Sequence, residues 1–180
     1  MKIIKTRLLL LMLFAIVSEN VFAQANNKGS FTINFGPEIA VPEIRFRETH
    51  KNGFGGSFKS EYTFGKHGSV ILNGGVTTFS GRTFYRGILL SDGRHRELVA
   101  IPVKTGGRYY LGNFYAQAEA GVVFLKQFRN STNAVFSLGA GDKLRLGKQV
   151  FDISLRQEMW LRRDGNYNMA VLRIAYEINL

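Results

Sequence analysis

The sequence predicts an all-β fold, a single eight-stranded antiparallel up-and-down transmembrane β-barrel. Three observations predict it: apolar and polar residues alternate along successive segments, the connections between the segments are short and long in turn, and an apolar stretch typical of an export signal precedes them. The alternation has the period of two of a β-strand. It covers residues 30–41, 54–64, 69–79, 98–111, 114–127, 134–146, 150–161 and 169–180.

Residues 1–23 have the features of a cleaved signal peptide. Three cations precede an apolar run at 8–17, which is shorter than the ~20 residues that a membrane-spanning helix needs. Cleavage after Ala23 would leave residues 24–180 as the barrel domain. An uncleaved anchor helix is the alternative, and the polar residues at 18–20 argue against it because they end the run early.

Each of the first four segments has one apolar face. These faces consist of Phe31, Ile33, Phe35, Ile39 and Val41; of Phe54, Phe58, Tyr62 and Phe64; of Val70, Leu72 and Val76; and of Val99, Ile101, Val103 and Tyr109. The segments are about as long as tilted membrane strands of roughly 9–11 residues.

The last four segments follow the same rule. Their apolar faces consist of Phe114, Ala116, Ala118, Ala120, Val122 and Phe124; of Ala134, Phe136, Leu138, Ala140, Leu144 and Leu146; of Phe151, Ile153, Leu155 and Met159; and of Ala170, Leu172, Ile174, Tyr176, Ile178 and Leu180. Asp142 falls on an apolar face and Trp160 on a polar one, so we expect β-bulges near both.

The polar faces carry charges of both signs, which would point into the barrel. They are Glu38, Lys59, Glu61, Lys104, Arg108, Glu119, Lys143, Arg145, Asp152, Arg156, Glu158, Arg173 and Glu177. An eight-stranded barrel has an interior that side chains can fill, and isolated charges there are costly. We therefore expect a ladder of ion pairs that plugs the barrel, with Gly75, Gly106, Gly121 and Gly139 making room for long side chains. A proton path or an ion site would need similar residues.

The connections predict the orientation. Glycine-containing turns at 65–68, 112–113 and 147–149 follow the even-numbered segments, and longer connections follow the odd-numbered ones. Short periplasmic turns and long outer loops are typical of outer-membrane barrels, so both termini would be periplasmic. Aromatic residues near the two ends of the segments agree with girdles at two membrane interfaces.

Charge and cysteine content narrow the partners. Removal of three cations and one anion with the signal would lower the formal net charge from +11 to +9, and the chain has no cysteine. Nucleic acid is not expected as a partner of an exported membrane protein, despite the basic charge. Export without disulfides leaves packing or a closed hydrogen-bonded sheet to stabilise the fold.

Residues 29–180 resemble the small eight-stranded outer-membrane β-barrel proteins of Bacteroidota-type, Gram-negative bacteria, which have a porin-like, OmpA/OmpX-like architecture. The resemblance is carried by FYAQAEAGV at 114–122, FSLGAG at 136–141, FDISLR at 151–156 and LRIAYEINL at 172–180. It implies an integral protein of the cell outer membrane. Such barrels commonly end in an aromatic residue, whereas this chain ends in Leu180.

The sequence predicts no catalytic, cofactor-binding or metal-binding residues. It predicts a structural, adhesive or surface-binding role, with lipopolysaccharide and outer-membrane lipids, or an external protein, as partners of the basic outer loops. The loop cations are Arg45, Arg47, Lys51, Arg82, Arg86, Arg94, Arg96, Arg129, Arg162 and Arg163.

Three alternatives stay open. A lipid A-modifying enzyme at the barrel rim would use His95 with Ser91 and Asp92, the local set that resembles a nucleophile and its base. A soluble exported lipocalin-like barrel would turn its apolar face inward and bind a small ligand there. An assembly or secretion accessory would work with periplasmic partners.

Overall fold

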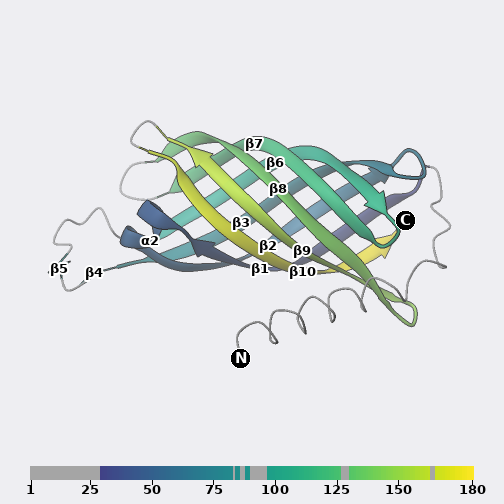
Figure 1. Cartoon of the computed structure of the whole chain (residues 1–180), viewed down its shortest axis with the longest axis horizontal. Helices are drawn as coiled ribbons and strands as arrows, with labels where there is room; N and C mark the ends of the chain where they lie inside the picture. Colours follow the sequence, from purple (N-terminus) through teal and green to yellow (C-terminus); the bar gives the residue numbers. More distant parts are fainter. Residues whose placement is uncertain (1–28, 83, 86–87, 90–96, 127–129, 163–164) are drawn as a thin grey trace, which may run out of the picture.

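The chain folds into a closed barrel of eight antiparallel strands, as the alternation predicts (Figure 1). The computed structural model describes residues 29–82, 84–85, 88–89, 97–126, 130–162 and 165–180. Barrel strands that are neighbours in sequence pair with each other, and the first pairs with the last to close the sheet. The strands are β1 (Phe31–Pro42), β2 (His50–Thr63), β3 (Gly68–Gly81), β6 (Leu98–Leu111), β7 (Phe114–Lys126), β8 (Ser131–Leu146), β9 (Gln149–Leu161) and β10 (Tyr167–Asn179).

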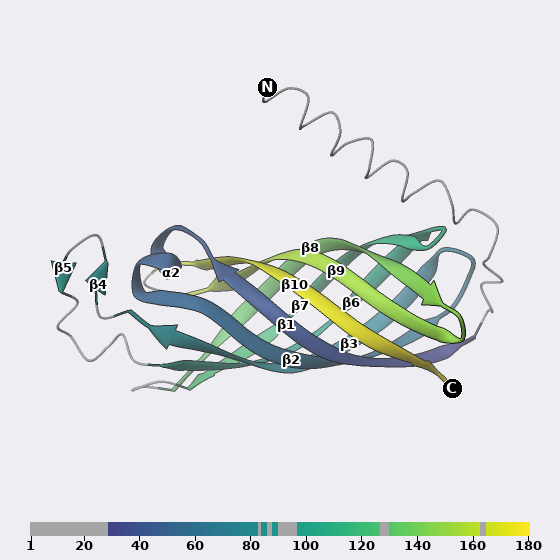
Figure 2. The ribbon, with the colours of Figure 1, turned by 90° about the horizontal axis from the view of Figure 1, so that it is seen from below.

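One end of the barrel, here called the short-turn end, carries the tight turns. Gly112 and Gly147 open two-residue turns with φ of 74° and 63°, which is the left-handed conformation that hairpin turns of this length require. The C-terminus lies at this end in both ribbon views (Figures 1 and 2). Gly29, the first described residue, is also here, because its amide donates to the Thr63 carbonyl oxygen at 2.8 Å.

The opposite end, here called the long-loop end, holds two small elements that the sequence analysis did not predict (Figure 2). A short helix, α2 (Ile44–Thr49), connects β1 to β2, and a two-stranded hairpin of β4 (Phe84–Tyr85) and β5 (Ile88–Leu89) lies between β3 and β6. β2 begins earlier than expected, at His50, with a register shift between His50 and Gly53.

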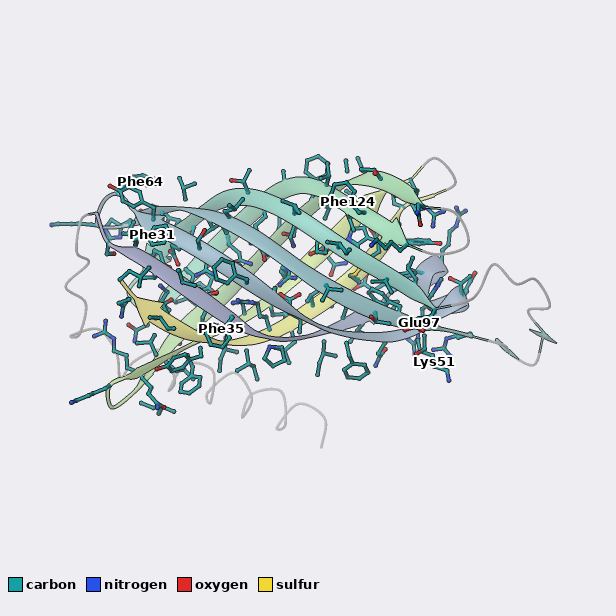
Figure 3. All side chains as sticks on the ribbon, turned by 180° about the vertical axis from the view of Figure 1, so that it is seen from behind. Phe31, Phe35, Lys51, Phe64, Glu97 and Phe124 are labelled. Carbon is teal, nitrogen blue, oxygen red and sulfur yellow. The ribbon has the colours of Figure 1, made fainter. Side chains whose placement is uncertain are left out.

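The two faces of the sheet differ sharply in polarity. Large apolar side chains point outward, and Leu138 and Phe54 are 69% and 63% exposed. Charged side chains such as Lys59 and Asp152 point inward and have no exposed surface. Exposed aromatic residues gather at both ends of the outer surface, with Phe31 and Phe64 at the short-turn end and Phe124 toward the other (Figure 3).

The two exceptions to the alternation need no bulge, so that prediction was wrong. The pairing of β8 and β9 runs through Asp142 and Trp160 without a shift. Trp160 points inward and is buried in an apolar layer at the long-loop end. Asp142 stays on the outer face beside Phe114, close to the short-turn end.

Candidate functional site

The barrel interior holds a balanced network of ion pairs. Six carboxylates meet six cationic side chains, as the sequence analysis predicted. They are Glu38, Glu61, Glu119, Asp152, Glu158 and Glu177, and Lys59, Lys104, Arg108, Lys143, Arg156 and Arg173. Arg145 was expected among them, but it is exposed at the rim of the short-turn end, where β8 ends.

Arg156 organises the part of the network nearest the long-loop end. Its Nη1 and Nη2 donate to the two carboxylate oxygens of Glu38 at 3.0 and 2.8 Å, and its Nε donates to Glu158 Oε2 at 3.1 Å. Lys104 bridges Glu158 to Glu119, and Trp160 Nε1 donates to Glu158 Oε1 at 2.8 Å. Paired donors of this kind match the carboxylate geometry and hold both partners in place.

Glu119 lies at the centre of the network. Lys59 Nζ is 2.9 Å from its Oε1, and Ser137 Oγ donates to its Oε2 at 3.0 Å. Lys59 Nζ also donates to Gln117 Oε1 at 3.2 Å, which accepts from Arg108 Nε at the same distance. Gln117 therefore links the central part of the network to the part nearer the short-turn end.

In the part of the network nearer the short-turn end, Arg108 joins two carboxylates. Its Nη1 lies 2.9 Å from Glu61 Oε2 and its Nη2 lies 2.8 Å from Asp152 Oδ2. The hydroxyls of Tyr110 and Tyr115 donate to Glu61 and Asp152 respectively. Lys143 then connects Glu61 to Glu177, at 3.3 and 2.8 Å.

The inward glycines act differently from the prediction. A Cβ atom on Gly106 or Gly121 would overlap the backbone of the adjacent strand, at Ala118 and Val103, rather than a long side chain. The nearest atoms to a Cβ on Gly75 would be in Gly56 and Ser57, and those nearest to a Cβ on Gly139 would be the Arg156 Cβ and the Leu155 carbonyl oxygen, both at 2.6 Å. These glycines therefore chiefly permit the close approach of neighbouring strands.

An apolar layer covers the network toward the long-loop end, and the sequence pattern did not predict it. Its buried members are Ala40, Phe46, Phe79, Leu98, Ala100, Val123, Leu125, Val135, Trp160, Met169 and Val171, with Tyr167 packed against them. Phe46 from α2 stacks on Tyr167 with ring centroids 4.2 Å apart and lies 4.9 Å from the Phe79 ring. The available signal was the apolar character of both faces at these strand ends, for example at Val123 and Leu125.

The surface of the long-loop end is basic among the described residues. The described residues at this end include six cationic side chains and three carboxylates. The cations are Arg45, Arg47, Lys51, Arg82, Lys126 and Arg162, and the carboxylates are Glu43, Glu48 and Glu97 (Figure 3 labels Lys51 and Glu97). Arg86, Arg94, Arg96, Arg129 and Arg163, the other predicted loop cations, lie outside the described residues.

The histidines do not form a catalytic group in the described structure. His50 is buried beside Phe46, and its Nδ1 is 2.8 Å from Thr49 Oγ1. His67 Nδ1 lies 2.9 Å from the Tyr110 carbonyl oxygen at the short-turn end. Ser91, Asp92 and His95 lie outside the described residues.

Metal-binding clusters and membrane-spanning helices are absent from the described residues. No group of three or more His, Cys, Asp or Glu side chains in this part of the chain could hold a metal ion. No helix in the same part is long and apolar enough to cross a membrane.

Solved structures share this fold. The attachment invasion locus protein Ail of Yersinia pestis, in complex with the heparin analogue sucrose octasulfate, is 19% identical, and the match covers 84% of this chain and 100% of Ail with a TM-score of 0.52. Ail in a phospholipid bilayer nanodisc matches with the same identity and coverage and a TM-score of 0.56. No family model and no curated protein matches the sequence.

Proposed function

We propose that this chain is an integral outer-membrane protein without catalytic activity, whose basic long-loop end binds phosphate- or sulfate-bearing molecules at the cell surface. The observation that carries the proposal is the polarity of the barrel. Large apolar side chains cover its outside and paired charges fill its inside. This distribution suits lipid around the barrel.

The topology supports a particular orientation. A closed barrel satisfies its backbone hydrogen bonds in lipid, where an open sheet edge would not. The short-turn end then faces the periplasm together with both ends of the mature chain, and the long-loop end faces outward. We further propose cleavage of the export signal after Ala23, which the mass of the mature protein tests. The Bacteroidota-type assignment stays a prediction.

We propose that the interior is plugged rather than open. The buried ion pairs are held in place by hydrogen bonds. The apolar layer around Phe46 and Trp160 lies between these ion pairs and the long-loop end of the barrel. Ions crossing this layer would lose their hydration in apolar surroundings, which is costly. A low single-channel conductance in planar bilayers is the expected result.

The binding role is supported by the basic surface of the long-loop end. Arginine suits phosphate and sulfate oxygens because its planar guanidinium can donate two hydrogen bonds side by side. The complex of Ail with a heparin analogue gives a precedent on the same fold for a sulfated ligand. Lipopolysaccharide phosphates and external sulfated glycans share this chemistry.

Two experiments test the proposal. The protein from isolated outer membranes should migrate faster in SDS gels when unboiled than when boiled, because a closed barrel resists detergent. The folded protein in detergent micelles should be retained by a sulfated resin. It should elute with salt, because ions screen the attraction between its exposed charges and the sulfate groups. Recovery in the soluble periplasm with a single unchanged band would overturn the membrane assignment.

The lipocalin-like alternative needs an apolar lumen, but charged side chains such as Lys59 and Arg173 line the lumen instead. An enzyme acting on lipid A would depend on His95, so His95→Ala would change the lipid A profile of the host. The binding role predicts an unchanged profile.

A further inference from the structure

Two arginines from different parts of the chain lie next to the same glycine, Gly165, at the long-loop end. Arg45 belongs to α2, next to Phe46, and Arg162 follows β9. The Arg162 guanidinium lies over the Tyr167 ring, with its Cζ 4.5 Å from the ring centroid. The same ring stacks on Phe46 with an interplanar angle of 8°. Buried Phe46 therefore positions the neighbouring Arg45, and the Tyr167 ring stacked on it positions the Arg162 guanidinium.

Gly165 brings the Arg45 side chain to the Arg162 turn. The Gly165 amide donates to the Arg162 carbonyl oxygen at 3.3 Å, and Arg45 Nη1 lies 2.6 Å from the point where a Cβ on Gly165 would stand. Gly165 also has a φ of +116°, which side-chain-bearing residues rarely adopt. A glycine is thus required here both by the backbone and by the neighbouring guanidinium.

Neither guanidinium has a counter-ion in the described part of the chain, where no carboxylate oxygen lies within 4.0 Å of Arg45 or Arg162. Glu43, which precedes α2, accepts a hydrogen bond from Gln157 Nε2 at 3.1 Å. A phosphate or sulfate oxyanion would supply the opposite charge that both guanidiniums lack in this part of the chain. Inside the barrel, by contrast, every arginine of the network has a carboxylate partner.

We propose that Arg45 and Arg162 form a two-armed site for a single phosphate or sulfate group. This inference rests on the proposed function and narrows it from a diffuse basic surface to one site. Each arm can donate two hydrogen bonds to tetrahedral oxyanion oxygens, and the aromatic stack holds the arms before the ligand arrives, which lowers the entropic cost of binding.

The test measures binding of sucrose octasulfate to the folded, full-length mature protein in detergent micelles. The variants are Arg45→Gln, Arg162→Gln, their double variant and Gly165→Ala, with Arg47→Gln as the matched control on the same helix. Faster migration of the unboiled protein in SDS gels verifies that each variant is folded. Sucrose without sulfate is the neutral probe.

We expect Arg45→Gln and Arg162→Gln each to weaken binding about tenfold, as for loss of a charge-assisted contact. The double variant should lose little more than either single variant, because one arm alone cannot enclose the group. Gly165→Ala should weaken binding without changing the charge, while Arg47→Gln changes it about twofold at most. Small, equal and additive losses across all the arginine variants would overturn the two-armed site.

The failure of the proposed function looks different. In that case the wild-type protein would bind sucrose octasulfate no better than sucrose. A second pair of probes identifies the source of the group: phosphatidylcholine vesicles with phosphorylated lipid A, and the same vesicles with dephosphorylated lipid A. If binding to the phosphorylated vesicles depends on Arg162, the result supports lipopolysaccharide. If the variants lose binding to sucrose octasulfate but their binding to the vesicles is unchanged, the result supports an external glycan. Equal binding of the wild type and the double variant to every probe overturns the site.

Discussion

Arg156 holds Glu38 with two parallel hydrogen bonds and Glu158 with a third, and all three residues are buried. Arg156→Met would leave two carboxylates facing too little positive charge. Breaking a buried ion pair by removing one partner costs about 3–5 kcal/mol. We expect a fall of this size in the free energy of unfolding, measured by urea titration of the protein in lipid vesicles.

Arg145→Met is the matched control, because Arg145 lies exposed at the rim and should change stability by no more than about 0.5 kcal/mol. The double variant Glu38→Gln with Arg156→Met should be less destabilised than the sum of the two single variants, since it removes both charges. Full additivity would show that the pair is not coupled.

A second residue-level prediction concerns the strand glycines. A Cβ on Gly106 would overlap the Ala118 carbonyl oxygen on β7, while a Cβ on Gly74 would meet no heavy atom within 4 Å. Gly106→Ala should therefore cost about 1–3 kcal/mol, which is typical of overpacking against atoms that cannot move aside. Gly74→Ala, which makes the same chemical change, should be neutral or slightly stabilising. The midpoint temperature for loss of the fast-migrating SDS band compares the two, and equal midpoints would contradict the close approach of β6 and β7.

At the scale of elements, α2 is held to the barrel largely through Phe46. Phe46→Ala should release the helix and expose Trp160, whose ring centroid lies 5.7 Å away, while the strand ladders stay intact. Trp160 is the only tryptophan of the chain, so its fluorescence should shift to longer wavelength and become easier to quench with acrylamide. Phe54→Ala removes a phenyl ring from the outer surface and should leave the emission unchanged. An unaltered Trp160 spectrum in Phe46→Ala would show that α2 does not cover the layer.

The elements also show what the sequence can predict. Strand alternation depends on nearest neighbours, so the eight strands and both faces followed from the sequence. Phe46 lies in α2 and Trp160 in β9, and their contact depends on tertiary packing that periodicity does not record. The same limit applies to Arg45 and Gly165, because they are 120 positions apart in the sequence. Asp142 departs from the alternation with a continuous ladder, and nothing in the structure explains its outward placement.

For the whole molecule, the decisive property is the solvent around the barrel. Leu155, 60% exposed, is at the middle of β9 and pairs with Leu172 and Ala140, so it would lie deep in the lipid. Leu146, 65% exposed, is the last residue of β8 at the short-turn end and would lie near the interface. The two leucines differ little in exposure and differ in depth.

An arginine on the lipid face of a barrel costs about 2–4 kcal/mol at the midplane and about 0–1 kcal/mol near the interface. Leu155→Arg should therefore lower the free energy of unfolding in vesicles by several kcal/mol more than Leu146→Arg. In water, both substitutions would replace an exposed leucine with a well-solvated side chain and would change stability little. A small and equal effect of the two would mean that water rather than lipid surrounds the apolar belt, and the outer-membrane assignment would fail with it.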